Sequence, residues 1–361
     1  MPNPPIKMTG RNVPPRRVHP KLSICIATYN RAGFVAETLD SIVQQLTPEV
    51  ELIVVDGASP DSTPEVVAPM AVRCPALRYY REKENSGVDR DYDKAVGYAG
   101  GEYCWLMTDD DVLVPGAIQR VLGALDGHPD WVVVNAEVRN VDLTVKLESP
   151  RLDIRADVAF DANQREDFFI RTANYLSFIG GVVIRRDAWL ARDRASYYGT
   201  LFIHVGVIFQ RPAIGSAKVI AQPLIMIRHG NAMWTPRGFE IWSFKWPALV
   251  WSFDDFSEAA RRSVCPREPW RGFKYLLFHR ALGSYSMAEF RKHLAGLSRG
   301  RERVVGWSTA RCPAAVANLA AVVYYGLFKR RSRVALYDVL RSRHAGVASR
   351  LAARALGILV R

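Results

Sequence analysis

The chain is poor in cysteine and has no cysteine pair at metal-binding or redox spacing. Its 361 residues include five cysteines, an odd number, and none stands in a CxxC motif. Two of them, Cys25 and Cys104, fall in runs that predict strands. This usage is typical of reduced thiols in a cytosolic compartment, and it argues against a disulfide framework and against a zinc site.

The two common glycine-rich phosphate-binding motifs are also absent. No G-x-G-x-x-G follows the first predicted strand, and the sequence contains no G-x-x-x-x-G-K-[ST]. Their absence argues against a Rossmann dehydrogenase and a P-loop kinase. Without such a glycine cradle, a bound diphosphate needs its charge neutralised by a metal ion.

An apolar secretory segment is missing from the first twenty residues, and the charge of the chain is mostly of one sign. The segment MPNPPIKMTGRNVPPRRVHP is proline-rich and basic, which predicts a disordered leader over 1–20 and a cytoplasmic location. The net charge is +13. Residues 301–361 carry twelve Lys and Arg against Glu302 and Asp338, so this tail holds most of the excess.

The sequence does contain a regular alternation of β-rich apolar runs and helical periods. With 49% hydrophobic and 24% charged residues, its composition is that of a folded globular protein. The predicted strands are 21–30, 51–55, 77–81 and 102–107, and the predicted helices are 31–46, a helix opened by Pro64, and 92–99. This order predicts an α/β fold with a doubly wound, mostly parallel sheet.

Polar residues follow each of these predicted strands. The four clusters are 28–31, 56–59, 85–90 and 109–111. Because ligands bind beyond the carboxyl ends of the strands in such sheets, we expect the four clusters to meet at one edge.

The last of these clusters is a run of three carboxylates, Asp109, Asp110 and Asp111, directly after an apolar strand. Such charges must reach solvent or meet a cation, and hard oxygen ligands on a short turn suit Mg²⁺ or Mn²⁺. The alternative is a solvated turn before a helix, whose N-terminus favours acidic residues. The run by itself leaves both possibilities open.

The chain resembles family 2 glycosyltransferases of the GT-A fold, and within them the abequosyltransferase-like enzymes of bacterial surface polysaccharide assembly. The resemblance covers about 21–235. It rests on KLSICIATYNRAGFVAETLDSI, ELIVVDGASPDST and NSGVDRDYDKAVGYAGGEYCWLMTDDDVLVPGAI, and more weakly on IGGVVIRRDAW and IRHG.

This resemblance implies a site for a nucleoside-diphosphate sugar. It places Thr28, Tyr29 and Asn30 around the nucleoside, although the usual preceding proline is Ala27 here. The other residues implied on this side are Asp56 at the base, Asp89 and Arg90 at the ribose and phosphate, and Arg31, Ser59 and Asp109 in the same loops.

The resemblance also implies a Mn²⁺ or Mg²⁺ ion. Thr108, Asp109 and Asp110 occupy the D-x-D position, which leaves Asp110 as the main metal ligand, with Asp111 beside it. His229, in IMIRHGNAMW, matches the histidine that completes the metal site in many GT-A enzymes. The alternative for His229 is a loop histidine next to a glycine turn.

The acceptor side departs from the family pattern. The glycine-containing segment 179–186 predicts a strand, which the resemblance implies faces the acceptor. In relatives a Glu-Asp pair follows, whose Asp is the general base. The matching segment, LFIHVGVIFQ at 201–210, has no carboxylate. His204 is its only ionisable side chain and could accept a proton near neutral pH, with Asp193 and Asp187 as the nearest carboxylates. The alternative for His204 is a histidine satisfied within an apolar segment.

The C-terminal region predicts helices and a basic surface. The apolar run 313–328 has sixteen residues, fewer than a membrane-spanning helix needs. Residues 336–360 interleave arginine with Leu, Val and Ala, which favours a basic amphipathic helix on anionic lipid. A solvated helical face packed on the catalytic core is the alternative. Nucleic acid is not expected, because no nucleic-acid-binding module accompanies the charge.

The sequence thus predicts a leader at 1–20, a nucleotide-sugar-binding half at 21–125, an acceptor-binding half at 126–255 and a helical, basic, membrane-associating extension at 256–361. The expected function is metal-dependent transfer of a sugar to a hydroxyl of a polyprenyl-diphosphate-linked saccharide, at the cytoplasmic face of the inner membrane. The alternatives are a sugar-1-phosphate nucleotidyltransferase and a non-catalytic polysaccharide-assembly protein.

Overall fold

A single ten-stranded sheet organises the computed structural model, which describes residues 19–213 and 215–358. The strand order is β3-β2-β1-β4-β9-β6-β10-β5, with β7 paired to β6 and β8 to β10. The strands are β1 Leu22–Thr28, β2 Val50–Asp56, β3 Leu77–Arg81, β4 Tyr103–Met107, β5 Val112–Leu113, β6 Trp131–Arg139, β7 Lys146–Glu148, β8 Val158–Phe160, β9 Val182–Arg185 and β10 Ala217–Arg228.

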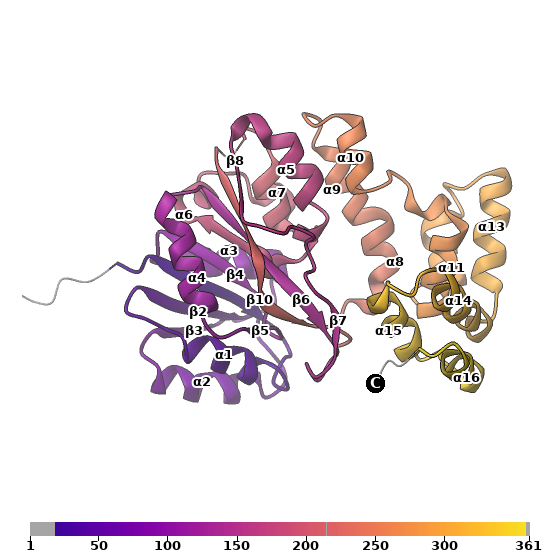
Figure 1. Cartoon of the computed structure of the whole chain (residues 1–361), viewed down its shortest axis with the longest axis horizontal. Helices are drawn as coiled ribbons and strands as arrows, with labels where there is room; N and C mark the ends of the chain where they lie inside the picture. Colours follow the sequence, from indigo (N-terminus) through magenta and orange to yellow (C-terminus); the bar gives the residue numbers. More distant parts are fainter. Residues whose placement is uncertain (1–18, 214, 359–361) are drawn as a thin grey trace, which may run out of the picture.

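The first half is the predicted series of parallel β-α units (Figure 1). Strands β3, β2, β1 and β4 are parallel neighbours, and β1 is buried along its whole length, as a continuously apolar parallel strand requires. The connecting helices are α1 Val35–Val43, α2 Thr63–Arg73 and α3 Val88–Tyr98. In α1, Val35, Leu39 and Ile42 are buried, which confirms the helical period.

The second half continues the sheet with one reversed strand. β9 is antiparallel to both β4 and β6, so β6 and the adjacent β10 run parallel to the first four strands. Residues 179–181 form a 3₁₀ turn before β9, where we had expected a strand. A Cβ atom added to Gly180 would lie 2.4 Å from the Phe178 ring, and one added to Gly181 would lie 2.8 Å from the Tyr175 ring. The two glycines therefore leave room for neighbouring aromatic rings.

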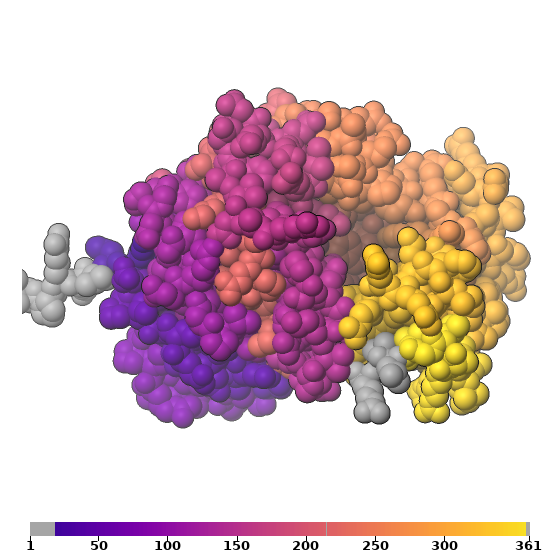
Figure 2. Space-filling model, in the orientation of Figure 1, coloured from indigo at the N-terminus to yellow at the C-terminus, as the bar shows by residue number. Residues whose placement is uncertain are grey.

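Helices cover the sheet and then form a separate C-terminal part, which appears in orange and yellow beside the sheet in Figures 1 and 2. The remaining helices beside the sheet are α4 Ala117–Ala124, α5 Arg165–Thr172, α6 Arg186–Leu190, α7 Ile203–Phe209, α8 Gly238–Glu240, α9 Trp246–Ser252 and α10 Glu258–Val264. Those of the C-terminal part are α11 Phe273–Leu282, α12 Met287–Glu289, α13 Gly300–Arg311, α14 Ala314–Phe328, α15 Arg333–Arg341 and α16 Val347–Ala355.

The hydrophobic cores follow this division with one difference from the predicted boundary at 255. Phe256, Ala260 and Val264 belong to the large core around the sheet, because α10 packs against α5. Smaller clusters fill the C-terminal part, where α14 packs against α11, α15 and α16. Within the described residues no single helix has the length and hydropathy of a membrane span, although α13 and α14, bent by 104° at their break, meet both criteria together.

Candidate active site

The carboxyl ends of β1, β2, β4 and β10 lie at the same edge of the sheet. This follows from the pairing: Thr28 is level with Asp56, and Ile26 is level with Met107 at the end of β4. Strand β10 has the same direction as these strands. The loops that follow the four strands can therefore contribute side chains to one site.

Three of these loops meet at the side chain of Arg31, which follows β1. Its Nε atom lies 3.4 Å from Asp109 Oδ1, and its Nη2 atom lies 3.4 Å from Asp110 Oδ2. Its Nη1 atom donates to the backbone oxygen of Asn231, 3.1 Å away. Asn231 in turn donates its side-chain amide to Asp110 Oδ2 at 2.8 Å. The Arg31 guanidinium, after β1, thus contacts both carboxylates, and the Asn231 amide, after β10, holds that of Asp110.

Asp111 has a different role from its two neighbours. It is buried, and its carboxylate accepts hydrogen bonds from the Thr108 hydroxyl and, at 2.7 Å, from the backbone nitrogen of Arg228. The Arg228 side chain returns to the same turn, because its Nε donates to the backbone oxygen of Asp110 at 2.8 Å. Asp111 therefore ties β4 to the end of β10, and its oxygens are already used by protein donors.

The acidic corner, which we define as Asp109, Asp110 and Asp111, carries more negative charge than its surroundings favour. Burial and the charge of Asp110 raise the pKa of Asp109 to about 7. Burial also raises the pKa of Asp110, against the opposing effect of Arg31. A bound cation would lower these pKa values again. The corner therefore has the oxygen ligands and the excess negative charge of a divalent cation site.

The protein alone does not enclose a metal ion in the part of the chain described here. No three His, Cys, Asp or Glu side chains among those residues gather around a common metal position. Mg²⁺ sites in nucleotide enzymes typically use one or two carboxylates, with phosphate and water supplying the other ligands. Asp109 and Asp110, each with 13% of the side chain exposed, fit that arrangement.

The loops after β1 and β2 are fastened to each other beside this corner. Asn30 adopts a left-handed backbone conformation with φ of 58°, and its backbone nitrogen donates to Ser59 Oγ at 2.9 Å. Thr28 is buried, whereas Tyr29 is 37% exposed at the surface. The sequence TYN therefore forms a fixed turn that presents Tyr29 and Asn30 next to Arg31.

Comparison with known proteins agrees with this geometry. The family model described as "Glycosyl transferase family 2" matches residues 23–190. Abequosyltransferase RfbV of Salmonella typhimurium is 30% identical over 233 residues, which cover 60% of this chain and 69% of that enzyme. The chain belongs to glycosyltransferase family 2. This membership favours a glycosyltransferase over the nucleotidyltransferase and the non-catalytic alternatives.

Another relative and a solved structure extend the comparison. The succinoglycan biosynthesis protein ExoO of Rhizobium meliloti is 28% identical over 124 residues, or 34% of this chain and 35% of that protein. The crystal structure of Staphylococcus aureus TarS residues 1–349 aligns with a TM-score of 0.50 at 15% identity, covering 88% of this chain and 90% of that one. That likeness supports the GT-A fold of this glycosyltransferase.

Asp56 of the glycosyltransferase is present at the expected edge but is fully buried. Its Oδ1 accepts from the backbone nitrogen of Ser59 at 2.8 Å, and its Oδ2 accepts from the Tyr79 hydroxyl at 2.6 Å. Oδ1 thus holds the loop after β2, and Oδ2 connects the end of β2 to β3. The contact with a nucleotide base that the resemblance implies remains a prediction for this residue.

Asp89 differs from its expected position facing ribose and phosphate. It is buried, and its carboxylate accepts three backbone N–H groups, from Gly199 at 2.8 Å, Leu201 at 2.9 Å and Ile203 at 3.1 Å. This side chain anchors the loop before α7, where Gly199 and Leu201 both have positive φ. The neighbouring Arg90 is exposed and lies over the Tyr198 ring, 4.4 Å from its centre.

The two residues expected to act as general base do not join the acidic corner. His204 is buried within α7, its Nε2 lies 2.7 Å from the backbone oxygen of Leu176, and burial lowers its pKa to about 4. Its Nε2 is therefore engaged by the backbone, whereas its buried Nδ1 has no hydrogen-bond partner among the described residues. Asp193 is exposed in a turn, where it receives the backbone N–H of Ser196 and its own N–H donates to Gln210 beyond the far end of α7.

His229 follows β10 but bonds to the C-terminal part of the chain. Its Nε2 lies 2.6 Å from Asp338 Oδ1, on helix α15. The contacts among the described residues therefore connect His229 to α15, whereas the resemblance implied a metal ligand. Sequence reasoning missed Asn231, Arg228 and Asp338. Asn231 lay in the quoted segment IMIRHGNAMW, but no sequence pattern connects Asp338 with residue 229.

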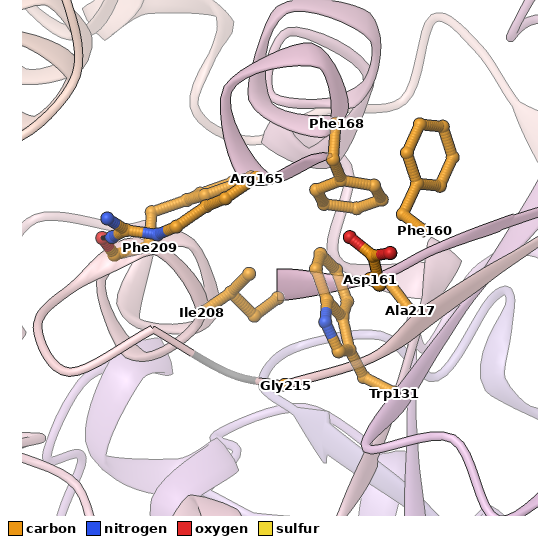
Figure 3. Close-up of a pocket in the computed structure, with 9 residues that line it drawn as sticks. All are labelled: Trp131, Phe160, Asp161, Arg165, Phe168, Ile208, Phe209, Gly215 and Ala217. Atoms are coloured by element: carbon orange, nitrogen blue, oxygen red, sulfur yellow. Dashed lines mark hydrogen bonds between the residues drawn. The ribbon is translucent and has the colours of Figure 1, made fainter. Parts of the chain in front are cut away.

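A small cavity elsewhere is not part of this site (Figure 3). It lies between α5 and the end of α7 and is lined in part by Trp131, Arg165, Phe168 and Ala217. Trp131 and Ala217 are the first residues of β6 and β10, so this cavity is at the opposite edge of the sheet from the acidic corner.

Proposed function

We propose that this glycosyltransferase moves a sugar from a nucleoside-diphosphate donor to a hydroxyl of a lipid-linked saccharide in bacterial surface polysaccharide assembly. The observation that carries the proposal is the meeting of Arg31, Asp109, Asp110 and Asn231 at the carboxyl edge of the sheet. The names of the relatives abequosyltransferase RfbV and succinoglycan biosynthesis protein ExoO support the pathway.

Asp110, assisted by Asp109, would hold a Mn²⁺ or Mg²⁺ ion. When bound, the ion neutralises the departing diphosphate, an effect worth several kcal/mol in comparable enzymes. Arg31 contacts both carboxylates and is only 11% exposed, so it balances part of their charge before the donor arrives. In this proposal its guanidinium also donates to phosphate oxygens of the donor. Asn231 fixes the orientation of Asp110 through its amide.

Substitutions of Asp193 and His204 test whether either residue is the general base that accepts the proton of the acceptor hydroxyl. Neither lies with the acidic corner, and His204 has its Nε2 bonded to a backbone oxygen. We therefore expect Asp193→Asn and His204→Gln to keep transfer within about tenfold of the unmodified enzyme, below the usual 10²–10⁴-fold effect of removing a general base. Steady-state rates of sugar transfer measure this. A loss of a thousandfold in either variant would return that residue to the catalytic role.

We also propose that the enzyme lies on the cytoplasmic face of the inner membrane through its C-terminal helices. Large apolar side chains are exposed on three of them, Trp307 on α13, Leu327 and Phe328 on α14, and Val347 and Leu351 on α16. Basic residues Lys329, Arg330 and Arg331 follow α14 directly. Apolar side chains flanked by basic ones bind anionic lipid surfaces.

A binding screen tests the donor half of the proposal. UDP, CDP, GDP and dTDP are titrated into the protein by calorimetry, with and without Mn²⁺. We expect one of them to bind in a Mn²⁺-dependent manner, and the corresponding nucleotide sugars then serve as donors in a transfer assay. Equal binding with and without the ion, or no binding of any nucleotide, would overturn the proposed metal-dependent donor site.

A further inference from the structure

Helix α15 of the C-terminal part contacts the same four-residue segment that holds the acidic corner. This segment is 228–231, at the end of β10. On one side, Arg228 and Asn231 bond to the turn of Asp110 and Asp111. On the other side, His229 and Gly230 meet residues of α15, more than a hundred positions later in the chain.

Tyr337 of α15 packs closely on this segment. It is buried against Val138 and Leu147 of strands β6 and β7. Its hydroxyl accepts the backbone N–H of Val141 at 3.2 Å. Its ring lies 3.0 Å from the position that a Cβ atom would take at Gly230, whose φ is +106°. A glycine is therefore required there for both backbone conformation and close contact.

Asp338, the next residue of α15, bonds to the other side of the segment. Its Oδ1 lies 2.6 Å from His229 Nε2, and the backbone nitrogen of His229 donates to the backbone oxygen of Arg139 at 2.9 Å. Arg228 reaches the same loop, because its Nη1 donates to the backbone oxygen of Val141 at 2.7 Å. The segment 228–231 is thus held between α15 and the acidic corner, with no intervening element.

We infer that Asp338 and Tyr337 are positioning residues for the donor site. They fix segment 228–231, and this segment sets the placement of Asn231 against Asp110 and of the Asn231 backbone oxygen against Arg31. The inference rests on the proposed function. It assigns to the C-terminal part a role in the geometry of the diphosphate site, in addition to any contact with lipid.

The test compares Asp338→Asn and Tyr337→Phe with the unmodified full-length protein. We expect each to weaken binding of the nucleoside diphosphate selected in the Mn²⁺ screen by about three- to tenfold, because a partly exposed charged hydrogen bond or a single hydroxyl is lost. The KM for the donor should rise by a similar factor, with kcat changed less. Asp254→Asn is the matched control, since that aspartate is 84% exposed and should leave both quantities unchanged.

A double-mutant cycle shows whether Asp338 acts through Asn231. Asn231→Ala removes the amide that holds Asp110, and Asp338→Asn should then weaken binding by less than twofold further, because the two changes disrupt the same connection. Full additivity would overturn the inference. So would nucleotide affinity in both single variants that stays within twofold of the control.

Three further outcomes are distinguishable. If Asp338→Asn lowers the unfolding temperature by more than a few degrees, Tyr337→Phe decides the matter, since it removes one hydroxyl and keeps the buried ring. If the unmodified protein binds none of the four nucleotides with Mn²⁺, the proposed function falls together with this inference. If it binds one and the variants bind equally well, only the inference falls.

Discussion

The sheet-bearing part and the C-terminal helical part of this enzyme solve different physical problems. In the first, parallel strands end at one edge and bring polar side chains from distant loops together, with Arg31 between Asp109 and Asp110. In the second, helices built around small residues such as Ala317 and Ala321 of α14 pack on one another, and large apolar and basic side chains stay outside. One part concentrates opposite charges, and the other displays positive charge.

The difference teaches where each function depends on local sequence and where it depends on tertiary contact. The donor site is built from residues that immediately follow strands, so short motifs describe most of it. The C-terminal part contributes through α15, whose contacts with segment 228–231 exist only in the folded chain. Substitutions in the two parts should therefore fail in different assays.

The largest expected effect separates the acidic corner from all other regions. Asp110→Ala should lower sugar transfer by at least a hundredfold, because it removes the main proposed metal ligand and leaves the diphosphate charge uncompensated. Circular dichroism should be unchanged, since Asp110 lies on a partly exposed turn. Asp254→Ala, an exposed acid far along the sequence, is the control. Full activity of Asp110→Ala in the presence of chelator would contradict the proposed role of the corner.

The second prediction concerns binding of the C-terminal part to lipid. Lys329→Gln combined with Arg331→Gln should weaken binding to anionic vesicles by roughly thirtyfold, since each basic residue near such a surface contributes about 1 kcal/mol. Co-sedimentation with vesicles of anionic and of neutral lipid measures it. Arg73→Gln on α2 is the matched control. No binding to either kind of vesicle would remove the proposed membrane role, and equal binding to both would remove the proposed preference for anionic lipid.

The third prediction is a pH dependence confined to the acidic corner. Because burial and Asp110 raise the pKa of Asp109 to about 7, its carboxylate takes up a proton as the pH falls from 8 to 6. Mn²⁺ affinity should therefore drop by up to about tenfold over this range. The stability of the metal-free protein should change in the opposite sense and rise as the pH falls. Since the folded-state pKa lies above the usual value of 3.8, this group favours the folded state more at pH 6 than at pH 8.

Manganese titrations followed by electron paramagnetic resonance, and thermal unfolding without metal, measure the two effects. Asp109→Asn is the control, since its amide does not titrate and should reduce the pH dependence in both measurements; burial also raises the pKa of the neighbouring Asp110 carboxyl. A Mn²⁺ affinity that is flat between pH 6 and pH 8 in the unmodified protein would contradict the assignment.

The smallest effect is expected where the two parts meet. Gly230→Ala introduces a Cβ atom 3.0 Å from the Tyr337 ring at a φ of +106°, so it should lower the free energy of unfolding by about 1–2 kcal/mol. Thermal unfolding measures this, and Gly33→Ala, with nothing within 4 Å of the added atom, is the control. An unchanged unfolding temperature would mean that the contact between α15 and segment 228–231 is loose.

Much of the fold could be predicted because apolar periodicity is local. Strand β3 has the predicted ends, 77–81, and β1, β2 and β4 differ by at most two residues. Helix α3 begins at Val88, four residues before the predicted start at Tyr92, because its first turn is polar. Acidic residues such as Asp89 and Asp91 favour a helix N-terminus without contributing to an apolar pattern.

The candidate site was predicted less completely, for reasons that particular residues make plain. Arg31, Asp109 and Asp110 come together because β1 and β4 are neighbours in the sheet. The β-α order predicted only that the loops after these strands share one edge. The sequence position of Asp89 matches that of a residue facing ribose and phosphate. Its carboxylate instead accepts three backbone N–H groups from a loop more than a hundred residues later in the chain. The pair His229 and Asp338 is separated by 109 positions, and no local pattern predicts it.

The most direct measurement of the central claim is a crystal structure of the protein with Mn²⁺ and the nucleoside diphosphate that it binds. We predict anomalous density for one ion in direct contact with a carboxylate oxygen of Asp110, with phosphate oxygens completing its coordination and Arg31 in contact with the diphosphate. A diphosphate bound away from the carboxyl edge of β4, or held there without any ion near Asp109 and Asp110, would contradict the account.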